Sequence, residues 1–127
     1  MFDPSELKFF ERTGMWYVHK SSELGMEIQV SDAGGEPDAA SLAQVYVFLS
    51  EREVLLPRCL DYLEHHLKFE GTARLRSLEA LARPNCHGAS LTLVYLTEAD
   101  RYMWLEVGLA PHVSHGFWPK YALVKYY

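Results

Sequence analysis

Two short stretches of the sequence carry side chains that bind metals or act as nucleophiles. Cys86 and His87 are neighbours in RPNCHGAS, and His112 and His115 follow in PHVSHG. Thiolate and imidazole are ligands that zinc prefers, so these four residues are the candidate metal ligands of the chain. Their spacing, Cys-His and His-x-x-His, matches no established zinc motif. We therefore predict exposed loop histidines, with no bound metal or other cofactor.

A catalytic role for the same residues is less favoured. Neighbouring side chains point apart in an extended chain, so Cys86 and His87 make a poor pair of nucleophile and base. The sequence also has no HExxH, GxSxG, phosphate-loop or GxGxxG motif. We expect a protein that is not an enzyme. The alternative is a small metal-assisted enzyme that uses Cys86, His87, His112 and His115.

The two loops flank the strongest strand signal in the chain. Residues 91–96 and 102–107 alternate in polarity on either side of the turn TEAD, which predicts an antiparallel hairpin. The outer ends of a hairpin meet, so the histidine-bearing loops could converge. A second hairpin is predicted over residues 15–20 and 26–32, and a last strand over 119–127. Residues 73–83 fit a strand or a helix equally well.

Two helices are predicted between the hairpins. The first begins at Pro37, and its apolar residues follow helical spacing. The motif SERE, residues 50–53, has the form of a capping box that starts the second helix. Pro57 then marks either a kink or the true start of that helix, and Gly71 ends it. The apolar stripes are Leu42, Val45, Tyr46 and Leu49, then Leu56, Leu60, Leu63 and Leu67.

These elements predict one α+β domain over residues 1–127, in the order β-β-α-α-(β)-β-β-β. We expect an antiparallel sheet of about five or six strands with two helices packed on one face, the usual way to bury both layers. The opposite face of the sheet is then left uncovered.

Composition narrows the functional classes. Of the 127 residues, 49% are hydrophobic and 23% charged, as in folded domains. The net charge of −5 disfavours nucleic-acid binding, which needs a basic surface. Residues 1–70 hold 13 acidic and 6 basic residues, so an acidic surface on this half could meet a basic partner. No signal peptide or long apolar run is visible, which predicts a cytoplasmic protein that does not contact membranes.

Aromatic residues in the last third suggest a binding surface. Tyrosine and tryptophan on an uncovered sheet face form an amphipathic patch of the kind found at binding hot spots. Acidic residues near the first predicted helix are the second group of candidate binding residues. The candidate binding residues are Trp118, Tyr121, Tyr102, Trp104, Glu36 and Asp38.

The run GGEPDAASLAQVYVFLSEREVLLPRCLDYLEHHL, followed by SLTLVYLTEADRYMWLEVGL, resembles small bacterial domains of unknown function. Such domains occur near polymorphic toxin systems, where acidic proteins of similar size serve as immunity proteins. The resemblance covers about the central two-thirds of the chain and carries over no catalytic residue. It implies an inhibitor that occludes a basic toxin. A homodimer formed through the tyrosine-rich last strand is a further hypothesis.

Overall fold

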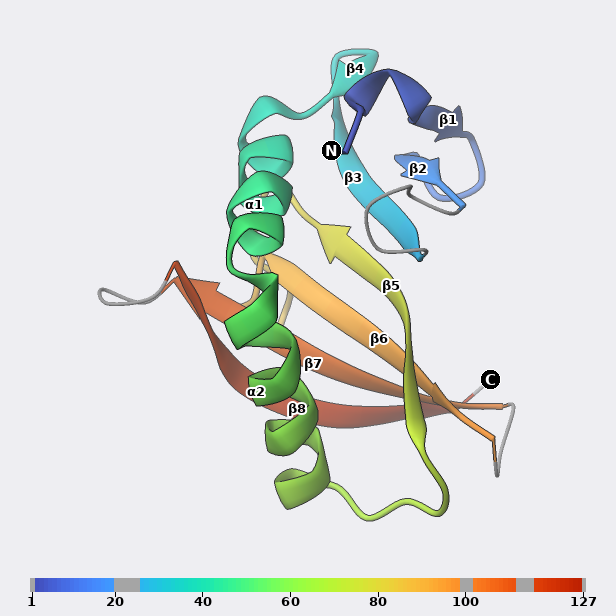
Figure 1. Ribbon diagram of the computed structural model, residues 1–127. Helices are drawn as coiled ribbons and strands as arrows, with labels where there is room; N and C mark the ends of the chain where they lie inside the picture. The colour runs from blue at the N-terminus through green and yellow to red at the C-terminus, as the bar shows by residue number, and fades with distance from the viewer. Residues whose placement is uncertain (1, 20–25, 99–101, 112–115, 127) are drawn as a thin grey trace.

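The structure, a computed structural model, describes residues 2–19, 26–98, 102–111 and 116–126 (Figure 1). It is an α+β fold, as the sequence predicted. Its elements in chain order are a 3-10 helix η1 (Pro4–Glu6), β1 (Lys8–Phe10), β2 (Met15–Val18), β3 (Glu27–Ala33), β4 (Glu36–Pro37), α1 (Ala39–Ser50), α2 (Arg52–His66), β5 (Ala73–Ala80), β6 (Leu91–Thr97), β7 (Met103–Pro111) and β8 (Phe117–Tyr126).

The sheet is larger than predicted and is not wholly antiparallel. The described residues form eight strands in the order β1-β2-β3-β5-β6-β7-β8, with β4 paired to β3. Neighbouring strands are antiparallel except β3 and β5, which run parallel with Ile28 opposite Leu78. The prediction of five or six antiparallel strands was therefore wrong. Because β4, α1 and α2 lie between β3 and β5, the chain crosses over and re-enters the sheet in the same direction.

Residues 73–80 form a strand, which settles the ambiguity of this segment. Leu75 lies opposite Tyr95 and Ser77 lies opposite Val94, so a β-bulge at Arg76 shifts the register by one residue. The shift allows Leu75 and Leu78, three residues apart, to pack toward the same core. The helix-like leucine spacing of this segment is therefore the result of a bulge.

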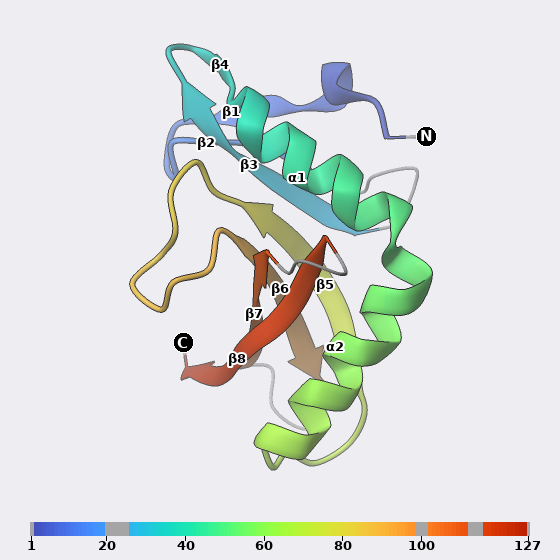
Figure 2. The same cartoon turned by 90° about the vertical axis from the view of Figure 1, so that its left-hand side faces the viewer.

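The two helices lie almost end to end along one face of the sheet (Figures 1 and 2). The helix α1 packs against β3 and β5, and α2 packs against β7 and β8. Among the described residues, no helix combines the length and the apolar character needed to cross a membrane.

The start of α1 differs from the prediction. Pro37 lies in β4, and the helix begins after Asp38. The Oδ2 atom of Asp38 accepts hydrogen bonds from the backbone N and the Oγ of Ser41, each at 2.8 Å. A carboxylate in this position satisfies amides that the first helical turn leaves free. Asp38 thus has a structural role as the N-cap of α1.

The predicted capping box at residues 50–53 does not form. Ser50 is the last residue of α1, and its Oγ donates to the carbonyl of Val47 at 2.7 Å. The amide of Glu51 still bonds to the α1 carbonyls of Val47 and Phe48, so the chain hardly leaves its helical path before α2 begins. The helix α2 then continues through Pro57, which rules out a start at that proline.

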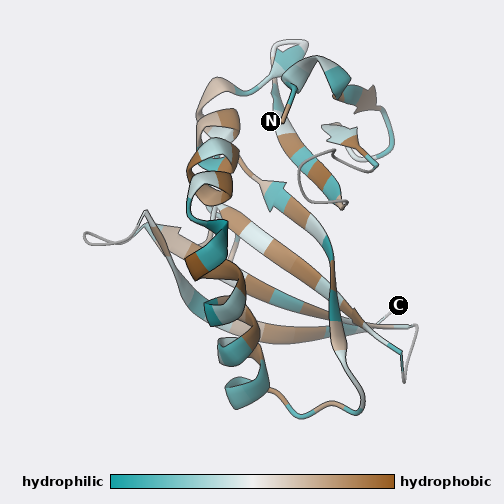
Figure 3. Cartoon of the chain, viewed as in Figure 1, coloured by the Kyte–Doolittle hydropathy of each residue, from teal (hydrophilic) through white to brown (hydrophobic). Residues whose placement is uncertain are grey.

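The hydrophobic core lies between the helices and the sheet. Figure 3 shows hydrophobic residues along the strands behind the helices and hydrophilic residues along the outer side of α2. Away from the register shifts in β5 and between β7 and β8, alternation sends every second strand side chain into this core and the remainder to the helix-free face. The largest fully buried side chains are Phe48, Ile28, Leu55, Leu63, Leu78, Leu91, Leu93, Leu105, Leu109, Val30, Val45 and Val107.

Candidate functional site

The helix-free face of the sheet is hollowed at its centre by a groove of about 300 Å³. Its floor is polar because these strand positions alternate with the buried ones. Glu27 lies opposite Ser77, and Gln29 lies opposite Glu79, across the parallel pair β3 and β5. Val94 of β6 completes the floor.

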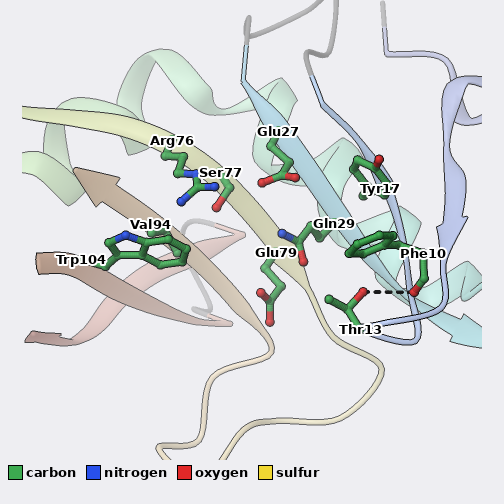
Figure 4. Close-up of a pocket in the computed structure, with 10 residues that line it drawn as sticks. All are labelled: Phe10, Thr13, Tyr17, Glu27, Gln29, Arg76, Ser77, Glu79, Val94 and Trp104. Atoms are coloured by element: carbon green, nitrogen blue, oxygen red, sulfur yellow. Dashed lines mark hydrogen bonds between the residues drawn. The ribbon is translucent and has the colours of Figure 1, made fainter. Parts of the chain in front are cut away.

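Two walls rise on either side of this floor (Figure 4). Phe10, Thr13 and Tyr17 from the β1–β2 hairpin form one wall, while Arg76 and Trp104 form the other. The rings of Phe10 and Tyr17 meet edge to face, with centroids 5.4 Å apart. The Cζ atom of Arg76 lies 4.3 Å from the centroid of the Trp104 ring.

The bulge in β5 is what gives the second wall its shape. An ordinary strand would send Leu75 and Ser77 to one face and Arg76 to the other. The extra residue instead lets Arg76 reach the helix-free face together with Ser77, where it stacks on Trp104. A β-bulge changes the face toward which a side chain points, and it leaves one residue of the strand without a partner on the neighbouring strand.

Glu27 and Glu79 form the acidic part of the groove. Within the described residues, neither carboxylate has a hydrogen bond or an ion pair. Burial raises the pKa of Glu79 above its ordinary value; repulsion from Glu106 and Glu27 adds to the rise, and Lys125 opposes it. Two positive charges lie near these carboxylates: Lys125, which opposes the rise in the pKa of Glu79, and Arg76 in the wall of the groove.

Glu106 lies beside the groove in a bonded network. It is only 6% exposed, and a buried carboxylate needs partners. Tyr121 donates to its Oε2 at 2.7 Å, and Lys125 donates to its Oε1 at 2.9 Å. Asn85 in turn donates from Nδ2 to the Tyr121 hydroxyl at 2.8 Å. Burial raises the pKa of Tyr121, as does Glu106, while the Asn85 hydrogen bond lowers it.

The predicted binding residues do not form one site. Trp104 lines the groove, and Tyr121 belongs to the adjacent network. Trp118 is half-buried beside α2, where the Cζ atom of Arg58 lies 3.8 Å from its ring centroid. Tyr102 is exposed immediately before β7 and lies outside the groove lining.

The two acidic candidates lie elsewhere. Glu36 is exposed on the short strand β4, and Asp38 is half-buried as the cap of α1. Neither of them lines the groove.

Cys86 and His87 belong to a turn organised by Asn85. The Oδ1 atom of Asn85 accepts from the backbone N of His87 at 2.9 Å and of Ala89 at 3.1 Å. The His87 ring packs on Tyr121, with centroids 5.1 Å apart, and Cys86 is exposed.

The predicted metal ligands His112 and His115 lie outside the described residues. In the part of the chain that the structure describes, no three residues of the types His, Cys, Asp or Glu are grouped to hold a metal. The four-residue metal site, Cys86 with His87, His112 and His115, stays a prediction.

Sequence reasoning missed most of the groove. Strand alternation by itself places Glu27 and Gln29 on one face of β3. What it could not indicate was that Glu79 lies beside them, because that depends on the parallel pairing of β3 with β5. Glu79 lies in residues 73–83, which fitted a strand or a helix equally well, so its face could not be predicted either.

Comparison of the chain with protein-family models, with curated protein sequences and with solved structures finds no match.

Proposed function

We propose that this chain is a non-enzymatic protein-binding domain whose groove receives a basic segment of a partner protein. The observation that carries the proposal is the pair Glu27 and Glu79, which lie in a hollow with aromatic walls. Within the described residues, neither carboxylate makes a hydrogen bond or an ion pair. Such a pair attracts a cation and repels a phosphate. The groove therefore suits a basic protein and not a nucleic acid.

The walls supply apolar contact area for such a partner. Tyr17, Phe10 and Trp104 surround the carboxylates, and aromatic residues of this kind dominate the energetics of protein interfaces. Surrounding apolar groups also exclude water, which strengthens the attraction between a carboxylate and a bound cation. The groove thus combines a charged centre with a hydrophobic rim.

The most specific form of the proposal is a cytoplasmic inhibitor of the immunity type that occludes a basic toxin. The net charge of −5 supports it, because complementary charge speeds the association of an inhibitor with a basic target. The resemblance to immunity-type domains points the same way.

The partner could bind either at the groove or at the acidic exposed side of α2, and charge variants distinguish these two surfaces. The double variant Glu27→Gln/Glu79→Gln neutralises the groove. The matched control, Glu53→Gln/Glu64→Gln, removes the same charge from exposed positions on α2. The binding partner in this test is the purified protein encoded by the adjacent gene, where the toxin of an immunity-type protein is expected. Its affinity for the wild type and for each variant is measured by calorimetry. We expect the groove variant to lose at least about tenfold in affinity and the control to change little.

Other outcomes contradict the proposal. Equal losses in both variants would show that overall charge, and not the groove, attracts the partner. A loss confined to the α2 variant would move the binding surface to the helices. Absence of any binding by the adjacent product would remove the immunity version.

Self-association through β8 is less well supported. β8 is the outer strand of the sheet, and it carries Pro119 together with the exposed Lys120 and Lys125. Proline and lysine on an edge strand oppose pairing with another strand. The Tyr62 hydroxyl also donates to the carbonyl of Lys120 at 2.9 Å, so one backbone acceptor of this strand is already used.

A further inference from the structure

We infer that the group held in the groove is the guanidinium of an arginine side chain on the partner. This inference rests on the proposed function and specifies the residue that enters. It follows from the floor, from the aromatic wall and from the way the chain uses its own Arg76.

The floor presents two acceptors to one ligand. Glu27 and Glu79 occupy neighbouring strands one diagonal step apart, with Gln29 next to both. A guanidinium is planar and has five N–H donors in a fixed fork, so it can bond to two carboxylates at once. A lysine ammonium is a compact and strongly hydrated charge that gains less from this arrangement.

The aromatic wall favours the same ligand. A guanidinium stacks on aromatic faces more readily than an ammonium does. Arg76 already makes such a contact, with its Cζ atom 4.3 Å from the centroid of Trp104. That wall is therefore occupied, and the incoming side chain meets the opposite wall, where Tyr17 packs against Phe10.

Arg76 also limits how strongly the groove attracts a cation. Its positive charge lies over Trp104 at the side of the groove, and it opposes the entry of a second guanidinium. Replacing Arg76 with glutamine removes this repulsion and leaves a side chain of similar length. The variant Arg76→Gln should therefore bind arginine more tightly than the wild type, which a purely structural role for Arg76 would not predict.

Glu79 gains most from a bound cation. It is partly buried, and the charged groups near it are Glu106, Glu27 and the ammonium of Lys125. Arg76, on the same strand, lines the same groove. Burial is the main cause that raises the pKa of Glu79, the two carboxylates add to the rise, and Lys125 opposes it. A guanidinium next to Glu79 favours the ionised form, so the affinity for arginine should fall as the pH is lowered toward that pKa.

The test uses three peptides, acetyl-Gly-Ser-X-Ser-Gly-amide, in which X is arginine, lysine or citrulline. Citrulline keeps the shape of arginine without its charge. Binding to the full-length chain is followed by the NMR shifts of backbone amides in β2, β3 and β5. We expect arginine to bind at least about threefold more tightly than lysine, and citrulline to shift these amides little.

Variants define the site. Glu79→Gln should weaken the arginine peptide about fivefold or more, because one of two charge-assisted bonds is lost. Arg76→Gln should strengthen it, and Glu64→Gln on α2 should change nothing. The amide spectrum of each variant reports directly whether it is folded.

The possible failures are distinguishable. If lysine binds as tightly as arginine and both depend on Glu79, the arginine inference falls and the basic-partner function stands. If no peptide binds but binding of the adjacent gene product still requires Glu27 and Glu79, the arginine inference is likewise wrong and the basic-partner function stands. If no peptide binds and the partner ignores both carboxylates, the inference and the proposed function fall together.

Discussion

The hydroxyl of Tyr121 donates a 2.7 Å hydrogen bond to Oε2 of Glu106, a carboxylate that is almost fully buried in β7. This bond ties the edge strand β8 to the charge beside the groove. The same hydroxyl accepts from Asn85, so it also holds the Cys86–His87 turn against the sheet.

We expect Tyr121→Phe to lower the free energy of unfolding by about 1.5–3 kcal/mol, the usual value of a hydrogen bond to a charged group. The ring remains, so the loss reports the hydroxyl alone. Urea denaturation measures it. Lys120→Met is the control, because this exposed ammonium lies 3.5 Å from the Gly88 carbonyl and should matter by less than about 0.5 kcal/mol. A Tyr121→Phe variant as stable as the wild type would show that the bond contributes nothing.

Gly108 provides the space that the Tyr121 ring occupies. The two residues lie opposite each other across β7 and β8, and a Cβ atom at Gly108 would overlap the ring. Gly108→Ala should therefore cost about 1–3 kcal/mol of stability through overpacking. In a Tyr121→Ala background the same change should cost nothing or stabilise, since alanine suits a strand better than glycine. An equal cost in both backgrounds would place the problem elsewhere than at the ring.

Glu79→Gln should stabilise the protein at neutral pH. The folded-state pKa of Glu79 is raised, so the folded state binds this proton more tightly than the unfolded state does. Stability is then highest below the unfolded pKa and falls as the pH rises through the folded pKa. The Tm advantage of Glu79→Gln should accordingly shrink as the pH is lowered toward the ordinary value of 4.5. A constant difference across this range, or a less stable variant at neutral pH, would contradict the assignment.

The two cysteines should react at very different rates. Cys59 is fully buried in α2, and burial raises the pKa of its thiol to about 12. The thiolate is the nucleophile, so this side chain is inert in the folded state. Cys86 is exposed in the Asn85 turn. Titration with a chromogenic disulfide should find one prompt thiol, absent in Cys86→Ser, and a second only after denaturation. Two prompt thiols would show that α2 opens readily.

Tyr95→Phe should raise the free energy of unfolding by about 1 kcal/mol. The Tyr95 hydroxyl is buried and has no hydrogen-bond partner among the described residues, and an unsatisfied buried group costs about 1–3 kcal/mol. Tyr62→Phe is the matched comparison, because its hydroxyl bonds to the Lys120 carbonyl at 2.9 Å. That variant should lose about 0.5–1.5 kcal/mol. Losses of similar size in both variants would imply that Tyr95 has a partner, such as a buried water.

The α+β class and most of the strands could be predicted because their signals are local. Alternation over residues 91–96 and 102–107 marks β6 and β7, and helical spacing marks α1 and α2. Segments that contain a β-bulge or the junction between two helices were harder to predict. The bulge at Arg76 gave β5 a helix-like leucine spacing, and the near-continuous path from α1 to α2 left Ser50 no free helix end to cap.

The sequence by itself determined the type and the approximate bounds of most elements, since the period of each pattern is local. It predicted their buried faces less well, because Tyr46 is exposed and α2 buries Leu55 fully but Leu56 only in part. Only the tertiary structure decided that Glu27 and Glu79 share a groove. These two residues are far apart in the chain, and they meet because α1 and α2 cross the sheet and return β5 parallel to β3. Strand partners depend on packing across the whole domain, which no local pattern encodes.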